Sequence, residues 1–418
     1  MQFHLLSFEG PDPYATAGGI ASRMTGLAQA LAGAGCETHL WFVGDPDLPG
    51  HETHDQLRLH RWCQWISRYH PAGVYDGEEG KRADYVASLP PFLLQEVLLP
   101  HLQDGGQGVV LAEEWQTVDA VLHVDWLLRQ AQARDRVTIF WNANNTFGFE
   151  RIDWRRLSKA AIITTVSRYM KHLMWSLGVN PLVIPNGLAA EALIPPEREA
   201  VTAFRAQLRH RTVVSKVARW DPDKGWLLAI DIIGAMKQHG WRPLLIARGG
   251  VEPHGHEVLA AAAATGLRVA ERVVSKPGVR DLLLAMEGLE KADIVSVRSP
   301  LCRASLRILF HASAAVLANS AHEPFGLVGL ETMAVAGVAC TGCSGEDYAL
   351  PGYNALVLET ADPQEFIRLF RELRANPGHE RALRRAGRRT AKQYVWPRII
   401  QRILLPKLHL FVSPPQLG

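Results

Sequence analysis

Hydrophobic and polar positions divide the chain into short apolar runs and longer amphipathic stretches, which alternate from one end to the other. Runs of four to eight apolar or β-branched residues predict buried strands, and apolar positions recurring every three or four residues predict helices. In the first half, a helix is predicted over 20–33 and strands over 3–8, 38–43, 108–111, 138–141, 161–166 and 182–184. The pattern continues with strands over 211–217 and 314–319 and a helix over 327–336. Such alternation is typical of parallel sheets covered by helices.

A proline pair interrupts this alternation near the middle of the chain. Pro195 and Pro196 resist both a helix and a central strand, and the strand series restarts only after them. We therefore predict an α/β fold of two tandem, Rossmann-like, doubly wound domains, covering residues 1–190 and 191–393. Tandem units of this kind leave an interdomain cleft in which a ligand can bind.

Composition agrees with a folded protein of two domains. The chain has 418 residues, of which 47% are hydrophobic and 21% charged, too long for one ordinary core and too apolar for disorder. A net charge of +3 gives no electrostatic reason to expect nucleic acid as a partner. No run approaches 18 apolar residues, and Glu9 comes too early for a signal peptide, so a cytoplasmic location is expected. The five scattered cysteines indicate neither a disulfide framework nor a metal site.

The most informative segment covers residues 321–334, where a strand leads through a turn into a helix. Glu323 lies in the turn, Gly326 allows the backbone to approach a ligand closely, and Glu331 lies about one turn into the helix. The first N–H groups of that helix suit a phosphate or a hydroxyl group. Two carboxylates facing one crevice suit a sugar. The alternative is a helix-end charge with a solvated glutamate, which would only stabilise the helix.

Two further loops have the composition of anion sites. Arg219 and Lys224 follow the strand over 211–217, and two cations at this spacing can hold a diphosphate. At the N-terminus, the Gly18-Gly19 pair between a strand and a helix lets backbone N–H groups approach an anion. Taken alone, the first loop could be surface charge and the second a simple tight turn.

Taken together, these segments resemble a known family. The string E-P-F-G-L-x-x-x-E at 323–331, the R-x-x-x-x-K-G element at 219–225 and the Gly-Gly loop with its preceding acid resemble retaining glycosyltransferases of the GT-B fold. Glycosyltransferase family 4 and the glycogen and starch synthases are members of this group. The resemblance implies transfer of a hexose from a nucleotide-diphosphate sugar, the co-substrate, to an acceptor hydroxyl. It implies no other cofactor and no required metal.

The resemblance also implies roles for individual residues. Arg219 and Lys224 would bind the pyrophosphate of the donor, and Glu323 the transferred sugar. Backbone N–H groups of Phe325, Gly326 and Leu327 would face the donor, with Glu331 on the ribose. Gly18 and Gly19 would border the reacting phosphate, and Ser344 and Gly345 stand where many members contact the donor sugar.

The segment over 112–117 departs from the family pattern. Trp115 and Thr117 match a strand end of the glycogen synthases, but Glu113 and Glu114 replace the histidine and aspartate of those enzymes. These two acids, together with Glu9, are candidates for contacts with the acceptor or the donor sugar. The alternative is an exposed acidic turn anchored by a buried tryptophan.

Two features near the C-terminus complete the comparison. Residues 394–396 resemble the family motif that introduces a last helix, which implies that 394–418 form a helix crossing back to the N-terminal domain and a tail. The basic stretch 381–392 is either a solvated helix face or a surface that weakly contacts a membrane holding a lipid acceptor.

Two functions of other classes stay open. A nucleotide-sugar epimerase shares this fold and needs acid and base groups beside the sugar, which Glu113, Glu114 or Glu9 could supply. A protein that has lost catalysis would bind the nucleotide sugar without turnover. The sequence leaves the donor base, the sugar, the acceptor and the oligomeric state undetermined.

Overall fold

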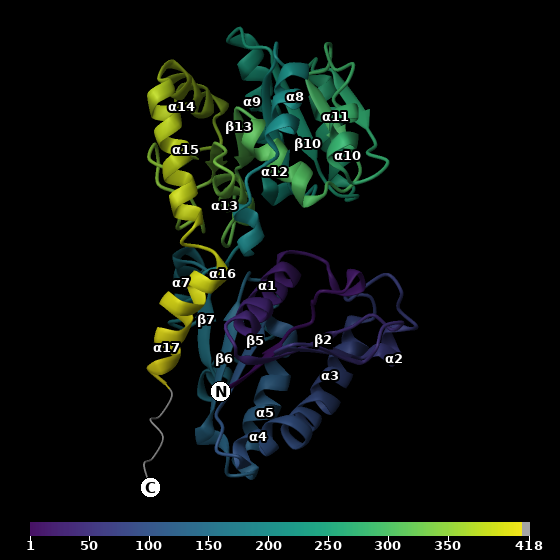
Figure 1. Ribbon diagram of the computed structural model, residues 1–418, viewed down its shortest axis with the longest axis vertical. Coiled ribbons are helices and arrows are strands. Elements are labelled where there is room, and N and C mark those ends of the chain that lie inside the picture. Colours follow the sequence, from purple (N-terminus) through teal and green to yellow (C-terminus); the bar gives the residue numbers. More distant parts are fainter. Residues whose placement is uncertain (412–418) are drawn as a thin grey trace. The chain divides into compact units, whose positions relative to one another are not determined.

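A computed structural model describes residues 1–411 of the chain and divides it into two compact units (Figure 1). Unit 1 comprises Met1–Ala189 and the segment from Tyr394 onward, and unit 2 comprises Ala190–Gln393. Each unit contains one twisted sheet with helices packed on it. Residues 412–418, the end of the segment expected to form a helix and a tail, lie outside the described residues.

Unit 1 is built on an eight-stranded sheet in the order β3-β4-β2-β1-β5-β6-β7-β8. All neighbours are parallel except the hairpin of β3 and β4. The strand order reverses between β1 and β5, and such a reversal opens a crevice at the carboxyl ends of the strands. The strands are β1 (Gln2–Leu6), β2 (Glu37–Val43), β3 (His51–His54), β4 (Leu57–Trp62), β5 (Gly108–Glu113), β6 (Val137–Ala143), β7 (Ile162–Thr165) and β8 (Leu182–Val183).

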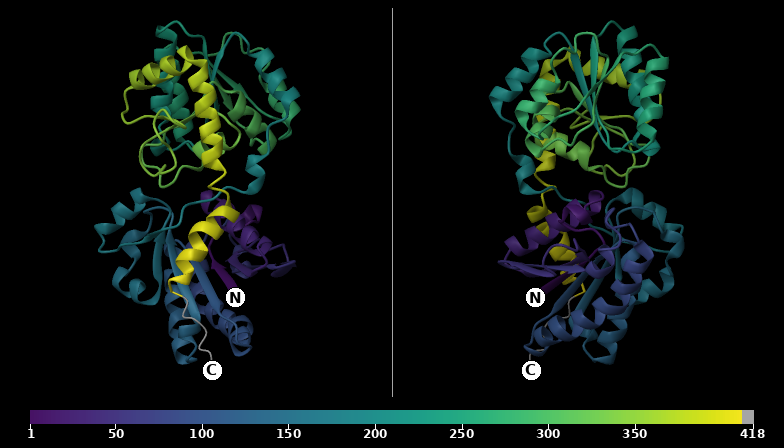
Figure 2. Two further views of the ribbon diagram at one scale, coloured as in Figure 1. Left: turned by 60° about the vertical axis from the view of Figure 1, so that its left-hand side comes forward. Right: turned by 90° about the vertical axis from the view of Figure 1, so that its right-hand side faces the viewer.

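Helices cover the sheet of unit 1, and the C-terminal segment belongs to this cover (Figure 2). The residues after Tyr394 bury Trp396, Ile399 and Leu404 in the same core as Phe3 and Leu27. The helices are α1 (Gly19–Gly33), α2 (Gln64–Ser67), α3 (Glu78–Phe92), α4 (Leu99–Gln103), α5 (Val118–Gln130), α6 (Trp154–Ala160), α7 (Arg168–Trp175), α16 (Trp396–Ile399) and α17 (Leu405–His409).

Unit 2 repeats the plan with a seven-stranded parallel sheet in the order β11-β12-β10-β9-β13-β14-β15. Its strands are β9 (Thr212–Val217), β10 (Pro243–Arg248), β11 (Val269–Arg272), β12 (Ile294–Val297), β13 (Ala315–Ala318), β14 (Ala339–Thr341) and β15 (Leu356–Val357). Its helices are α8 (Arg198–Gln207), α9 (Trp226–Gln238), α10 (His254–Ala264), α11 (Val279–Ala285), α12 (Arg303–Ala312), α13 (Leu327–Ala334), α14 (Pro363–Ala375) and α15 (Pro377–Ala391).

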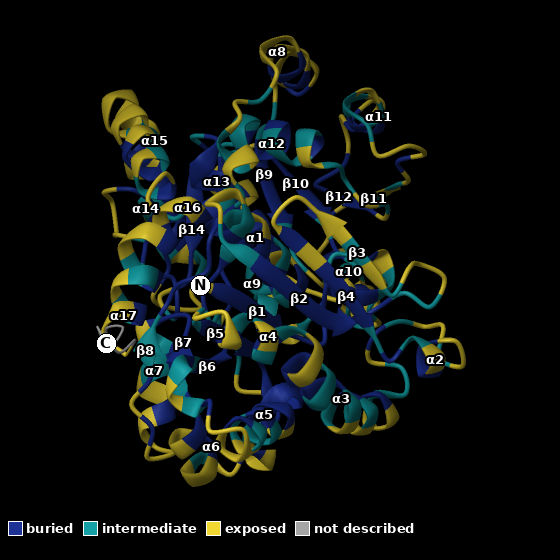
Figure 3. Cartoon of the chain, turned by 60° about the horizontal axis from the view of Figure 1, so that its bottom comes forward, coloured by how far each residue is buried: buried dark blue, intermediate teal, exposed yellow. Residues whose placement is uncertain are grey.

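Burial explains why the strands could be read from the sequence. Helices pack on the faces of parallel strands, so both sides of each strand are apolar and the strand appears as a continuous hydrophobic run. In Figure 3 the central strands of both units are coloured as buried, whereas helices such as α15 and α17 carry exposed residues along one side. The predicted strands and the helices over 20–33 and 327–336 are confirmed to within a few residues.

Two of the parts of unit 1 that the sequence did not predict have a local physical explanation. The hairpin of β3 and β4 is short and mixes polar with apolar residues, which hides its period. Helix α3 contains Pro90 and Pro91 near its end and continues into a π-helical turn at Leu93–Leu98. Pro90 lacks an N–H and would normally end a helix, but its ring is buried and the wider turn accommodates the local break.

Candidate active site

In unit 2, the loops that leave β9 and β13 meet at the carboxyl edge of the sheet. These strands are neighbours, so their ends lie side by side. Lys224, at the end of the loop from β9, donates from Nζ to Oε2 of Glu323 at 2.8 Å. Ala321 N–H donates to Asp223 O at 2.9 Å and ties the same two loops through their backbones. The structure therefore brings together two of the predicted site residues as an ion pair.

The second cation predicted for this loop is Arg219. Arg219 is exposed, and its Nη2 lies 3.8 Å from Oδ2 of Asp221, a weak contact. Its guanidinium is thus available to a ligand, whereas Lys224 already uses one of its three donors on Glu323. The sequence suggested a clamp of two cations; in the folded protein Lys224 is paired with Glu323, and Arg219 is exposed with a long contact to Asp221.

A second loop holds the Glu323 turn in place. The Glu323 N–H donates to Oγ of Ser344 at 2.9 Å, and the Gly345 N–H donates to Glu323 O at 2.8 Å. A Cβ on Gly345 would lie 2.2 Å from the carbonyl oxygens of Glu323 and Pro324, so only glycine fits. Ser344 and Gly345 therefore support the turn that carries Glu323.

Glu346, in the same loop, is a site residue that the sequence analysis missed. Its Oε2 accepts from Ser344 N–H at 3.1 Å, while its Oε1 is buried with no hydrogen-bond partner. Burial, with a smaller contribution from the nearby Glu323 charge, raises the pKa of Glu346 to about 8. The raised pKa favours the protonated form of Glu346, which can donate a hydrogen bond. The only sequence signal was an acid two residues after Ser344.

Helix α13 begins beside the ion pair. Gly326 is its N-cap in a left-handed conformation (φ 78°), and the preceding residue, Phe325, is buried and anchors the turn. N–H groups in the first turn of a helix, starting with Leu327, lack intrahelical acceptors and suit an anion. Glu331 lies one turn further and is partly buried, and burial raises its pKa to about 7. Both predicted carboxylates thus belong to one local structure.

In unit 1, the Gly-Gly turn holds an anion that the protein itself supplies. Oε2 of Glu9 accepts from the N–H groups of Gly18 and Ala21, both at 3.0 Å. Oε1 of Glu9 accepts from the hydroxyl of Tyr75 at 2.7 Å. The carboxylate therefore caps the positive end of α1 in the place where a phosphate was expected to bind. Gly19 remains exposed at this turn.

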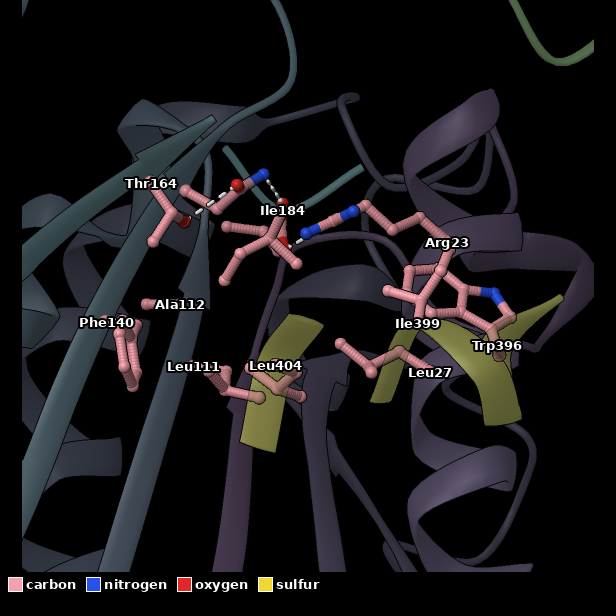
Figure 4. A pocket seen from close by; sticks show the side chains of 12 residues that line it. Arg23, Leu27, Leu111, Ala112, Phe140, Thr164, Ile184, Trp396, Ile399 and Leu404 are labelled. Carbon is pink, nitrogen blue, oxygen red and sulfur yellow. Dashed lines mark hydrogen bonds and ion pairs between the residues drawn. The ribbon is translucent and has the colours of Figure 1, made fainter. Parts of the chain in front are cut away.

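Glu113 is an internal structural acid in this conformation. It is 2% exposed, and its Oε1 accepts from Nε of Arg23 at 2.9 Å. Its Oε2 accepts from the side-chain amides of Asn142, at 2.9 Å, and Asn144. The ion pair lines a cavity of about 20 Å³ (Figure 4), which has room for a water molecule but not for a sugar.

Glu114 is buried and has a strained backbone conformation. Its backbone lies at φ 66° and ψ 166°, a region used almost only by glycine, which costs about 1–3 kcal/mol. The carboxylate is 5% exposed and accepts from Asn144 N–H at 2.6 Å. Burial raises the pKa of Glu114 to about 8 against the lowering effect of this bond. The alternative of an exposed acidic turn over 113–114 is wrong, because both acids are buried.

Comparison with known proteins identifies the architecture. No protein-family model and no curated protein matches the chain. Among solved structures, sucrose-phosphate synthase from Thermosynechococcus elongatus superposes with a TM-score of 0.67 at 20% identity, covering 99% of this chain and 100% of that one. The chain has the GT-B fold. The predicted fold class and the likeness to glycogen and starch synthases are therefore confirmed.

Two more GT-B structures match over nearly the whole chain. The catalytic domain of Arabidopsis thaliana starch synthase IV, bound to ADP and acarbose, has a TM-score of 0.65 at 16% identity and covers 96% of this chain and 99% of its own. Anabaena HepE in complex with UDP and glucose has a TM-score of 0.62 at 14% identity, with 98% and 100% covered. At these identities the likeness establishes the fold.

The basic stretch of this GT-B chain is only partly a solvated face. Arg384 and Arg388, on α15, point inward and donate to backbone carbonyls that include Ala336 O and Ala334 O, both at 2.9 Å. They cap the C-terminal end of α13 and its following turn. The other cations of the stretch, Arg381, Arg385, Arg389 and Lys392, are exposed.

Residues 1–411 contain neither a cluster of metal-ligating side chains nor a helix that could span a membrane. No group of three or more His, Cys, Asp or Glu side chains in this range could hold a metal ion. No helix in the described part of the chain has both the length and the apolar character needed to cross a membrane.

Proposed function

We propose that this protein is a retaining glycosyltransferase that moves a hexose from a nucleotide-diphosphate sugar to an acceptor hydroxyl without a metal. The observation that carries the proposal is the Lys224–Glu323 ion pair beside the N-terminal end of α13, at the carboxyl edge of a GT-B sheet. This pair places a cation and an acid beside the first N–H groups of a helix, at the edge where α/β sheets bind ligands.

The donor is held by unit 2 in this proposal. Arg219 and the two remaining donors of Lys224 bind the diphosphate and neutralise the charge that develops on it as the bond to the sugar breaks. Glu323 accepts from hydroxyls of the hexose and Glu331 from those of the ribose. The ligands of two structural neighbours, UDP in HepE and ADP in starch synthase IV, agree with a nucleoside diphosphate as the leaving group.

The acceptor is bound by unit 1, where Glu9 and Glu114 are the candidate contacts. Glu9 occupies the Gly-Gly turn, so a negatively charged acceptor group would be repelled there, and a neutral hydroxyl fits better. In transfer, the bond from the anomeric carbon to the phosphate oxygen breaks, with its electron pair going to the diphosphate. The acceptor oxygen bonds to the same face of that carbon and gives its proton to the leaving phosphate. No protein nucleophile is assigned.

The experiment is a mass-spectrometric panel of the purified protein with UDP-, GDP- and ADP-sugars, with and without acceptor mixtures, and with EDTA throughout. Nucleoside diphosphate released only when an acceptor is present supports the proposal and names the donor. A changed sugar without release indicates an epimerase. Tight binding of a nucleotide sugar without any product indicates a binding protein that lacks catalysis.

A further inference from the structure

A charged side chain lies in the apolar core of unit 2 and has no role in the proposed chemistry. Lys216 is on β9, a central strand between β10 and β13, and is 1% exposed. It lies two residues from Val214, on the face that packs Trp226, Leu317 and Cys340. A lysine in such a place must find acceptors for its ammonium group, because an unpaired buried charge is strongly destabilising.

The ammonium finds those acceptors on the neighbouring strand. Nζ of Lys216 donates to Oδ1 of Asn319 at 2.8 Å and to Leu317 O at 3.3 Å. The same nitrogen lies 5.3 Å from the centroid of the Trp226 ring, a cation–π contact. These contacts place the charge directly beneath the loops that leave β9 and β13.

Asn319 passes this restraint to the loop that carries Lys224. Its Nδ2 donates to Gly225 O at 3.3 Å. Gly225 has a left-handed conformation (φ 63°), and a Cβ there would lie 2.3 Å from Asn319 O. The two loops are therefore in close contact at this point, next to the hydrogen bond from Ala321 to Asp223.

We propose that Lys216 is a positioning residue that holds Asn319 against Gly225 and so aligns Lys224 with Glu323 for the donor diphosphate. This inference rests on the proposed function for the identity of the ligand. Its geometric part, the restraint of the two loops, concerns the free protein and can be tested without any nucleotide. An ammonium group with three donors serves this purpose because it bonds both Leu317 O and Asn319, and a methionine of similar length would bond neither.

The charge of Lys216 makes the restraint depend on pH. Burial lowers the pKa of Lys216 to about 7; the charge of Lys224 lowers it further, while the charge of Glu323 acts in the opposite direction. Cys340 stays a neutral thiol near neutral pH, because burial raises its pKa to about 12. Loss of the proton replaces a charge-assisted hydrogen bond to Asn319 with a weaker neutral one. The loops are therefore held more tightly below pH 7 than above it.

The test compares Lys216→Met with the wild-type protein and with Lys237→Met. Lys237 pairs with Asp293 on the same unit and lies outside the site, so its variant controls for loss of a lysine. Hydrogen exchange of residues 219–225 and 319–325 is measured in the free protein by mass spectrometry, and UDP, GDP and ADP affinities are measured from pH 6 to 8.5. The ratio of wild-type to variant affinity cancels the titration of the nucleotide itself.

We expect Lys216→Met to exchange both loops at least about tenfold faster, because Oδ1 of Asn319 loses the donor that holds it in place. Nucleotide affinity should fall about tenfold at pH 6.5 and by less at pH 8.5, and Lys237→Met should match the wild type. Unchanged loop exchange, or a wild-type affinity that keeps a constant ratio to that of the variant across the pH range, would overturn the proposal.

A second variant keeps the test decisive if Lys216→Met does not fold. Asn319→Asp leaves the lysine with a partner but removes the donor to Gly225, so it should also speed exchange of residues 219–225. Exchange equal to that of the wild type would contradict the proposal that Asn319 restrains the loop at Gly225. If the wild-type protein binds none of the three nucleotides, the proposed function fails, while the exchange data still decide the role of Lys216.

Discussion

At the scale of single residues, the ion pair in unit 2 separates binding from transfer. Lys224→Met removes a cation from the proposed diphosphate site, and we expect UDP, GDP or ADP affinity to fall at least about tenfold. Glu323→Gln frees Lys224 for the phosphates and removes the sugar contact. Nucleotide affinity should then stay equal or increase, while the transfer rate falls by about 10²–10³.

Titration calorimetry and acceptor-dependent turnover measure these two effects. Glu150→Gln, which changes an exposed glutamate of unit 1, is the control. Equal losses of nucleotide affinity in Lys224→Met and Glu323→Gln would show that the pair acts as one structural unit, and the division of roles would be wrong.

The raised pKa of Glu114 predicts how its replacement changes stability with pH. In the unfolded chain this acid titrates near 4.5, whereas in the folded protein its pKa is about 8. Because the folded state binds the extra proton, this group contributes stability that is present below pH 4.5 and is lost as the pH rises to 8. Glu114→Gln cannot ionise, so it should be more stable relative to the wild type at pH 8 than at pH 5.

Urea unfolding of unit 1 at the two pH values measures this difference. A pKa shift of one unit corresponds to about 1.4 kcal/mol, so a relative gain of up to about 4 kcal/mol is expected between pH 5 and pH 8. Parallel stability curves for Glu114→Gln and the wild type would indicate that Glu114 ionises normally in the folded protein.

At the scale of elements, the C-terminal segment packs against α1 at a glycine, Gly26. A Cβ at Gly26 would lie 2.5 Å from Nε1 of Trp396. Gly26→Ala should therefore displace the tryptophan and destabilise unit 1 by about 1–3 kcal/mol. Gly33→Ala on the same helix meets nothing within 4 Å and should be neutral or stabilising by up to about 1 kcal/mol. The melting temperatures of both variants check this contrast.

Four strands of unit 1 share a stack of histidine rings, of which those of His4, His39 and His60 are buried. His39 and His60 are 3.0 Å apart through their ring nitrogens, and Trp41 stacks on His60 with ring centroids 3.7 Å apart. His4 on β1 and His51 on β3 extend the stack. Burial lowers the pKa of His39 to about 4 and that of His60 to about 3.

The histidine stack predicts loss of stability in acid. The unfolded rings bind protons near pH 6.5, above their folded pKa values, so stability contributed by the neutral rings is lost as the pH falls from 6.5 towards 4 and 3. His60→Phe keeps the stacked volume and cannot protonate, so its unfolding midpoint should depend less on pH over this range. His54→Phe, at an exposed ring, is the control. Equal pH dependence in all three proteins would contradict the account.

At the scale of the whole molecule, each unit has its own core and should unfold in its own transition. The cores around Trp226 and Phe204 belong to unit 2, and the core around Phe3 and Trp396 belongs to unit 1. All proposed donor contacts lie in unit 2. A nucleoside diphosphate at 100 times its Kd should therefore stabilise unit 2 by about 2.7 kcal/mol and unit 1 far less. Hydrogen exchange resolved by unit checks this, and equal protection in both would place the main contacts elsewhere.

The α/β fold and the segments that form the site could be predicted from the sequence. Parallel strands buried on both faces remain visible as apolar runs, and glycine turns such as Gly326 are required by local backbone geometry. Motif spacing placed Glu323, Glu331 and Lys224 at strand ends and helix starts, where the structure has them. The hairpin of β3 and β4 lacked such a period and was not found.

Tertiary structure alone decided which partner each of these groups has. Lys224 pairs with Glu323, 99 residues away in the chain, and Glu113 pairs with Arg23, 90 residues away. Glu9 fills the turn that the sequence offered to a phosphate, and Lys216 is held by a strand about 100 residues further on. Local composition cannot reveal such contacts, because strand order and burial, which are properties of the folded chain, determine which charges meet and which remain free.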